Sequence, residues 1–280
     1  MPNDESLKVD VATHFEFGEN WAAFSGSINE ARIREAELGI TNLISTGELA
    51  GRSFLDIGCG SGIHSLAALN LGAESVTAID IDPASVATSK HTLEKFSATG
   101  KFRCLVGSVF DSPLDDDERF DIVYSWGVLH HTGSMWEAIE NAIDRVTPDG
   151  KLVIAIYLKT PFCRFWKAEK RFFKSLPKLL RWPIVWLYSA LCFIRILAKG
   201  ENPISHIAEY EKHRGMSWYR DRIDWLGGYP YESASSEEIV NFVKRHGGEL
   251  EKAVGTTPSI GLLGSGCAEY VFEFGRADAG

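Results

Sequence analysis

The sequence predicts a doubly wound α/β fold, in which helices cover both faces of a largely parallel sheet. From residue 53 to residue 157, short apolar runs rich in β-branched residues alternate with segments of helical apolar spacing. The apolar runs are nearly continuous, which indicates strands buried on both faces. A glycine-rich turn joins the first strand to the helix after it. Strands that alternate with helices in this way form parallel sheets.

The individual elements carry local signals of their own. Asp82 before Pro83 indicates a helix start, because the Asp side chain caps the first turn and Pro fits its first position. Ser235 and Glu238 have the spacing of a capping box, and Gly247 closes that helix. In chain order we expect a helix over 28–46, a strand over 54–58, a helix over 62–71, a strand over 75–80, a helix over 83–96, strands over 101–107 and 120–126, a helix over 135–146, a strand over 151–157, a helix over 235–247 and strands over 249–254 and 267–274.

These signals divide the chain into four parts. We expect an N-terminal helical cap over 1–50, a core over 51–157, a helical and aromatic insertion over 158–232, and a closing helix with two strands over 233–280. The insertion follows the carboxyl end of a strand. It should therefore lie on the edge of the sheet where ligands bind in such folds.

Composition limits the classes of function. A net charge of −9 argues against a nucleic-acid-binding surface over the whole protein, so we expect no nucleic-acid partner. The five cysteines lie apart, without a CxxC pair, which fits a reducing cytoplasm and offers no metal cage. Residues 1–13 are polar and acidic and do not resemble a signal peptide. We therefore expect a cytoplasmic location.

The stretch FLDIGCGSGIHS, residues 54–65, places three alternate glycines where a strand ends. Such a cluster indicates a close approach to the backbone. Its GxGxG spacing differs from the dinucleotide fingerprint GxGxxG. Asp56, two residues before Gly58, suits an ammonium group better than a diphosphate, and Asp80 would accept hydrogen bonds from both ribose hydroxyls. The pattern predicts S-adenosylmethionine, with NAD as the alternative because NAD sites also use an acid like Asp80.

Five motifs carry a resemblance to a known family. DIGCGSG, AIDIDPASV, VGSVFD, FDIVYSWGVLHHT and PDGKLVIAIY occur in the order typical of class I S-adenosylmethionine-dependent methyltransferases. The chain resembles this family over roughly residues 50–157 and is similar to its small-molecule type, which includes the quinone-biosynthesis methylases. The resemblance implies a Rossmann-like, seven-stranded sheet with an antiparallel last strand. It also implies an enzyme of the EC 2.1.1 class.

The resemblance also implies where the cofactor binds. Asp80 and Ile81 would take the ribose and one face of the adenine, and Ser108 would bind the adenine edge, although many relatives have an acid there. The Ser125 carbonyl would lie near the amino group. In this fold an N-terminal segment closes over the cofactor, so Trp21 would cover the sulfonium, with plain packing as the alternative. The predicted cofactor residues are Trp21, Asp56, Gly58, Gly60, Gly62, Asp80, Ile81, Ser108, Val109, Ser125 and Trp126.

His130 and His131 follow the fourth strand, where this fold presents residues to the acceptor. Methyl transfer needs sulfur, carbon and nucleophile in one line, and a hydroxyl acceptor gains from a general base that titrates near neutrality. We expect one of the two to be this catalytic base, with a structural turn as the alternative. No metal site is expected, because adjacent histidines seldom point at one ion.

The insertion is strongly basic. Residues 158–199 hold ten Lys or Arg and one acid, Glu169, a local charge of +9 against −18 for the rest. Apolar residues at helical spacing, with lysines such as Lys170 between them, predict an amphipathic basic helix broken near Pro177. The apolar run over 182–194 is too short to span a bilayer. Three interpretations of this helix are open. It forms a lid whose lysines are solvated, it contacts an anionic membrane, or its basic face binds an anionic acceptor.

A polar and aromatic stretch over 213–232 would line the acceptor site. Its candidate substrate residues are Tyr219, Arg220, Asp224 and Tyr229. The whole pattern predicts methyl transfer to a small-molecule acceptor, anionic or lipid-linked, at a hydroxyl oxygen. Peripheral membrane contact would run through residues 158–199, at the inner face of the membrane. The alternatives are an NAD-dependent oxidoreductase and a noncatalytic regulatory protein that keeps the cofactor site.

Overall fold

The computed structural model describes residues 28–97, 101–214, 218–257 and 259–275. Within them, a seven-stranded sheet has the strand order β3-β2-β1-β4-β5-β7-β6. The first five strands are parallel, and β7 runs antiparallel to both β5 and β6. This arrangement confirms the predicted fold class. The strands are β1 (Ser53–Ile57), β2 (Ser75–Asp80), β3 (Lys101–Val106), β4 (Phe120–Trp126), β5 (Val146–Tyr157), β6 (Gly248–Val254) and β7 (Cys267–Phe274).

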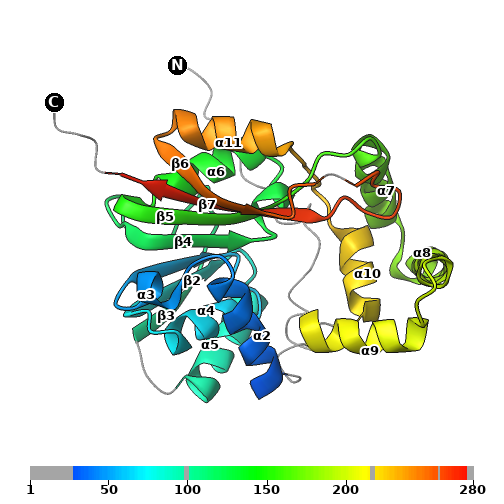
Figure 1. The fold of residues 1–280 in the computed structure, drawn as a ribbon, viewed down its shortest axis with the longest axis horizontal. Helices are drawn as coiled ribbons and strands as arrows, with labels where there is room; N and C mark the ends of the chain where they lie inside the picture. Colours follow the sequence, from blue (N-terminus) through cyan, green and yellow to red (C-terminus); the bar gives the residue numbers. More distant parts are fainter. Residues whose placement is uncertain (1–27, 98–100, 215–217, 258, 276–280) are drawn as a thin grey trace.

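Helices cover the sheet on both faces, as Figure 1 shows. On one face, α6 (Met135–Ile143) and α11 (Ser236–Arg245) contribute to a core cluster with the strands. On the other face, α2 (Glu30–Thr41), α4 (Ile63–Asn70) and α5 (Pro83–Phe96) contribute to a second cluster. The short α3 (Thr46–Leu49) leads into β1.

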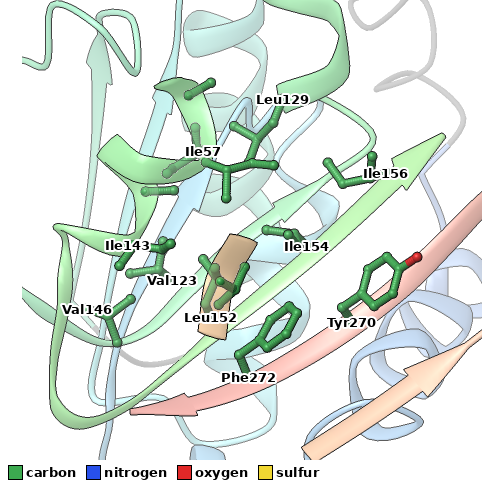
Figure 2. Packing of buried hydrophobic residues seen from close by; sticks show 14 of the residues in the cluster. Ile57, Val123, Leu129, Ile143, Val146, Leu152, Ile154, Ile156, Tyr270 and Phe272 are labelled. Atoms are coloured by element: carbon green, nitrogen blue, oxygen red, sulfur yellow. The ribbon is translucent and has the colours of Figure 1, made fainter. Parts of the chain in front are cut away.

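The strand β5, between β4 and β7, gives this fold much of its core. Leu152, Ile154 and Ile156 alternate along it and are buried in the cluster shown in Figure 2, together with Phe272 of β7. Burying one such side chain contributes about 1.5–3 kcal/mol. Because a slip of one residue would turn this whole row to the other face, the pairing of β5 with its neighbours is strongly specified.

Four helices follow β5 and lie together beyond one end of the sheet, at the right of Figure 1. They are α7 (Cys163–Ser175), α8 (Lys178–Ala198), α9 (Pro203–Arg214) and α10 (Trp218–Gly227), and we call them the lid helices. They have an aromatic core of their own, and α9 also contacts α2. A parallel bridge between Leu158 and Ala234 joins the points where the chain leaves and re-enters the core.

The structure corrects three expectations about these elements. The helix expected over 28–46 ends at Thr41, and a separate short helix, α3, begins at Thr46 because Ser45 and Glu48 form a capping box there. The helix expected over 135–146 ends at Ile143, since Val146 already pairs with Phe120 at the start of β5. The apolar run over 182–194 lies within α8, whose 21 residues form one continuous helix.

Candidate functional site

The glycine loop follows β1 and adopts a backbone that other residues rarely accept. Gly58, Gly60 and Gly62 have φ values of 78°, 52° and 75°. A Cβ on Gly58 would overlap the Val128 side chain, and one on Gly62 would lie 2.8 Å from the Ser89 Cα. At these two positions the close approach that the sequence predicts is made by the protein itself. The loop is thereby locked against the end of β4 and against α5.

Asp56 fastens the loop to the helix that follows. Gly62 stands at the N-cap of α4 without a capping side chain. The Ser65 hydroxyl donates to Asp56 Oδ2 at 2.6 Å, and the Ser65 backbone N–H also donates to this carboxyl group. Burial raises the pKa of Asp56 to about 7. The structure thus gives Asp56 a partner inside the fold, and its contact with a cofactor amine stays a prediction.

Asp80 joins the ends of three strands. Its Oδ2 accepts from the Gly60 N–H at 3.0 Å, and its Oδ1 accepts from the Asp82 N–H at 2.9 Å. Its backbone carbonyl accepts from the Gly107 N–H at 2.9 Å. Burial raises the pKa of Asp80. The Ile81 backbone N–H also donates to this carboxyl group. Since a carboxylate offers about four lone-pair positions, it keeps capacity for one more donor.

Ser108 and Val109 follow β3 directly after this contact. The Ser108 hydroxyl accepts from the Phe110 N–H at 3.2 Å, and the Val109 carbonyl accepts from Asn141 at 3.1 Å. Both residues are half-buried, as is Ile81 at the end of β2. The structure therefore brings Asp80, Ile81 and Ser108 together at the carboxyl ends of neighbouring strands.

The end of β4 has a mainly structural role. The buried Ser125 hydroxyl donates to the Ile57 carbonyl at 3.0 Å, which ties β4 to β1. The indole N–H of Trp126 donates to Glu269 of β7 at 2.6 Å. Gly127 has a φ of 77°, and among the described residues no atom lies within 4 Å of a Cβ placed on it.

The two histidines occupy the short helix η2 (Leu129–His131) and have different surroundings. His130 is fully buried and packs against Tyr157, with the two rings tilted by 40° and their centroids 3.9 Å apart. Burial, with the charges of His131 and Lys170 acting in the same direction, lowers the pKa of His130 well below its usual value. Among the described residues no hydrogen bond of normal geometry forms at either ring nitrogen, and the Ala155 backbone acts in the opposite direction, to raise this pKa. His130 is therefore a neutral core residue, and the base role predicted for it is not supported.

His131 is half-buried and held in one orientation. Its Nδ1 lies 2.7 Å from the Pro230 carbonyl oxygen, and because a carbonyl only accepts, Nδ1 carries the hydrogen. The lone pair of the neutral ring then lies on Nε2. A Cβ on Gly228 would stand 2.8 Å from His131 Cε1, so the chain there needs glycine. The His131 N–H also donates to the Val128 carbonyl, and Val128 is the residue that contacts the glycine loop.

An aromatic cluster from the lid helices surrounds this turn. Trp225 and Tyr231 both lie 5.4 Å from the Tyr157 ring, centroid to centroid. Lys170 of α7 is fully buried beside them, with its Nζ 3.6 Å from the Trp225 ring centroid and donating to the Trp225 carbonyl. Burial lowers the pKa of Lys170 to about 7. One of the three interpretations of the basic segment leaves its lysines solvated, and the buried position of Lys170 contradicts it for this residue.

The comparisons with known proteins agree with this geometry. Residues 55–154 match a family model described as a methyltransferase domain. This segment is a methyltransferase domain. Over 116 residues the chain is 34% identical to the mitochondrial ubiquinone biosynthesis O-methyltransferase of Schizosaccharomyces pombe. This match covers 41% of each of the two chains. Over 106 residues it is 36% identical to a tRNA U34 carboxymethyltransferase of Hahella chejuensis. This match covers 38% of this chain and 32% of that one.

One solved structure extends the similarity of fold to nearly the whole chain. It is a magnesium protoporphyrin IX methyltransferase from Synechocystis with bound S-adenosylmethionine, at 13% identity and a TM-score of 0.55. The match covers 97% of this chain and 100% of that one. The matches cover only 41% and 32% of the length of the two curated relatives named above. The predicted resemblance to S-adenosylmethionine-dependent methyltransferases is confirmed for the domain.

The residues present fit the predicted cofactor, S-adenosylmethionine. Asp80 keeps acceptor capacity for a ribose hydroxyl, and in the described part of the chain no atom lies within 4 Å of a Cβ placed on Gly127. The carboxylates of Asp56 and Asp80 suit a cationic ligand better than a diphosphate. Trp21 lies outside the described residues, so its predicted contact stays a prediction.

The predicted acceptor residues fall into two groups. Asp224 and Tyr229 flank the turn at Gly228, where the Gly228 N–H donates to the Asp224 carbonyl beside His131. Tyr219 instead stacks on Trp182 of α8, with ring centroids 6.2 Å apart. The Arg220 side chain lies outside the described part of the chain. The geometry therefore favours Asp224 and Tyr229 over Tyr219 as neighbours of the reacting groups.

Sequence reasoning missed the residues that enclose His131. Lys170 lies four residues after Trp166 and three before Phe173, and all three are buried on one face of α7. Helical periodicity therefore held a signal for its burial, although its charge favoured the opposite reading. Trp225 and Tyr231 belong to the stretch over 213–232 that was expected to line the acceptor site, but only the folded chain brings them against Tyr157 at the end of β5.

Proposed function

We propose that the whole protein is an S-adenosylmethionine-dependent methyltransferase that methylates a hydroxyl oxygen of a small molecule. The methyltransferase domain over residues 55–154 supports the reaction class. The orientation of His131 supports the choice of oxygen, because a hydroxyl must lose its proton as it is methylated. The cofactor, when bound, supplies an electrophilic methyl group on a sulfonium.

The chain's own residues position the base and exclude water. Pro230 holds Nδ1 of His131, so that Nε2 accepts the proton of the acceptor hydroxyl as the new O–C bond forms. The contacts of Val128 with both the glycine loop and His131 keep base and cofactor loop in a fixed relation. The rings of Tyr157 and Trp225, with the buried Lys170 packed against Trp225, lie around this turn and exclude bulk solvent.

The aromatic surroundings favour a small acceptor with an apolar or aromatic body. Tyr157 meets the His131 ring edge to face, with centroids 5.3 Å apart, and Trp225 and Tyr231 extend the apolar surface from there. Flat rings of this kind bind planar or apolar groups. A relative that modifies tRNA makes a nucleic acid the alternative acceptor, and the experiment below includes it.

Methyl transfer from isotope-labelled cofactor tests the proposal. Purified protein is incubated with the cofactor and, separately, with a metabolite extract and with total RNA. We expect one or more small metabolites to gain a single labelled methyl group, with a methoxy carbon in the product's NMR spectrum. Label on RNA, or on nitrogen or carbon of the metabolite, would overturn the acceptor class. Calorimetric binding of NAD without binding of S-adenosylhomocysteine would overturn the reaction class.

We further propose that the protein works in the cytoplasm, at the inner face of a membrane. All five cysteines are free thiols in the structure, and scattered thiols are typical of a reducing compartment. The basic charge of residues 158–199 supports the membrane side of this proposal.

A further inference from the structure

The outer face of α8 is apolar along nearly its whole length. Val185, Tyr188, Ser189, Cys192 and Ile196 form its buried face. The opposite face exposes Leu179, Leu180, Trp182, Trp186, Leu187, Leu191, Phe193, Ile194 and Leu197, each at 39% or more of its surface. A helix on the surface of a soluble protein carries polar side chains on that side. Here both faces of α8 are apolar.

Neighbouring segments extend this apolar surface. Phe165 and Phe172 of α7 are exposed. So are Ile260 and Leu262, in a loop held to the lid helices: Trp166 donates to the Gly261 carbonyl at 2.7 Å, and Tyr188 donates to the Leu263 carbonyl at 3.0 Å. Twelve of the eighteen exposed large hydrophobic side chains of the described residues lie between residues 165 and 204. We call the exposed apolar side chains of α7, of α8 and of this loop the lid face.

Basic side chains surround the lid face. Arg164, Lys167 and Arg171 of α7 are exposed, as are Arg195 and Lys199 at the end of α8. Between Lys178 and Arg195, the only charged residue of α8 is Arg181, which donates to the Leu176 and Lys174 carbonyls at the end of α7. The apolar strip is thus uninterrupted, and its rim is positive in a protein that is otherwise acidic.

We propose that the lid face binds the surface of an anionic lipid bilayer, with α8 lying in the plane of the membrane. An apolar face with a basic rim is the pattern of interfacial helices, and Trp182 and Trp186 suit the headgroup region. Anionic headgroups neutralise the rim, whereas a second copy of this chain would bring one positive surface against another.

α8 meets the length and composition of a membrane-spanning helix in the described part of the chain, with a mean hydropathy of 1.4. It nevertheless packs one side on the other lid helices. Val185, Tyr188 and Cys192 belong to the same cluster as Trp218 and Leu226 of α10. Crossing the bilayer would pull this packed side away from its partners. An orientation in the membrane plane keeps both the packing and the burial of the exposed side.

Flotation with vesicles tests this proposal without any measurement of methyl transfer. We expect the full chain to float with vesicles that contain one third phosphatidylglycerol and to bind less at high salt. The variant Leu187→Glu with Ile194→Glu should lower the partition coefficient at least about tenfold. Leu38→Glu, at an equally exposed leucine of α2, is the matched control and should bind as the unchanged protein does. The variant Arg171→Gln with Arg195→Gln should lower the partition coefficient about fivefold for each charge removed. This loss should occur with anionic vesicles and not with neutral ones.

Melting temperature and S-adenosylhomocysteine affinity, measured for every variant, separate loss of binding from loss of fold. No flotation of the unchanged protein with anionic vesicles would overturn the proposal. So would binding that the two Glu substitutions leave intact. A dimer that these substitutions dissociate, in a protein that does not float, would assign the lid face to a second copy instead. Because flotation needs no acceptor, failure of the methylation proposal would leave this result unaffected.

Discussion

At the scale of single residues, the histidine turn separates two side chains that the sequence leaves equivalent. Adjacent histidines have the same chemistry, and only the fold shows that His130 is enclosed while His131 is held by Pro230. The sequence predicted the position of this pair correctly, since it follows a strand end. It did not predict the difference between them, because the Pro230 carbonyl lies 99 residues further along the chain.

Replacing His131 by Asn should separate base chemistry from structure. The Asn amide can still donate to the Pro230 carbonyl, but it cannot accept a proton near neutral pH. We expect kcat to fall by a factor of about 10²–10⁴. The pH profile of kcat should no longer show the rise that reports deprotonation of the base, and the affinity for S-adenosylhomocysteine should stay unchanged. Steady-state kinetics and calorimetry measure these quantities. His130→Phe is the control and should keep turnover; equal losses in both variants would contradict the assignment.

Asp56 should make stability fall as the pH rises. Its pKa is about 7 in the folded protein and near 3.8 when exposed, so between these values the folded state binds more protons than the unfolded state. Unfolding free energy therefore decreases over this interval. Asp56→Asn removes this dependence and retains an acceptor for Ser65. Relative to the variant, the unfolding free energy of the unchanged protein should fall by on the order of 2–4 kcal/mol between pH 4 and pH 8.

Urea titrations at several pH values measure this difference. Asp121→Asn is a control of opposite sign, because Asp121 accepts from the Ser53 backbone and hydroxyl groups and its pKa is lowered. Its carboxylate stabilises the fold above its normal pKa and loses that effect as the pH falls. Parallel stability profiles for the unchanged protein and Asp56→Asn would contradict the burial argument.

At the scale of elements, regular segments with a complete local signal were predicted best. The strands Ser75–Asp80, Phe120–Trp126 and Cys267–Phe274 and the helix Pro83–Phe96 have the predicted bounds. Buried strands are continuous apolar runs, and Asp82 with Pro83 defines a helix start. The start of β5 was missed because Val146 pairs with Phe120 across an irregular stretch before the main run begins at Lys151. Such pairing depends on the neighbouring strand.

The turn between β1 and α4 should be sensitive to one methyl group. Gly62→Ala combines a left-handed backbone with a Cβ placed against Ser89, so we expect a loss of about 2–4 kcal/mol in unfolding free energy. Gly51→Ala has almost the same φ and no atom within 4 Å of the new Cβ, and it should cost about 1–2 kcal/mol. Equal losses in denaturant titrations would show that backbone strain alone accounts for both.

The lid helices show where periodicity is insufficient. Phe165, Trp166, Phe172 and Phe173 have the same apolar character, yet only Trp166 and Phe173 are buried. Their partners come from α8, α10 and the loop before α11, so no local pattern distinguishes the inner side of α7 from the outer. The predicted break near Pro177 is confirmed, because a proline at the start of α8 is a local feature.

At the scale of the whole molecule, ligand binding should stabilise the sheet as one unit. Asp80 connects the glycine loop, α5 and the segment after β3, so a ligand held there links several elements. S-adenosylhomocysteine at a hundred times its dissociation constant should raise the unfolding free energy by about 2.7 kcal/mol. This corresponds to a rise of several degrees in melting temperature. NAD should produce no such rise. Asp80→Ala should abolish the shift, while Asp82→Ala, which removes only a helix cap, should retain it. A shift that persists without Asp80 would contradict its role.

The bridge between Leu158 and Ala234 has a consequence for how such a protein can diversify. The Ala234 N–H donates to the Tyr157 carbonyl at 3.1 Å, and the Lys159 N–H donates to the Ala234 carbonyl at 2.9 Å. The inserted segment between them therefore begins and ends at the same pair of hydrogen bonds. Between these residues the chain can lengthen, shorten or exchange its helices while the paired strands on either side stay in register. Selection can thus alter which molecule is modified, and on which surface, without rebuilding the part that holds the methyl donor.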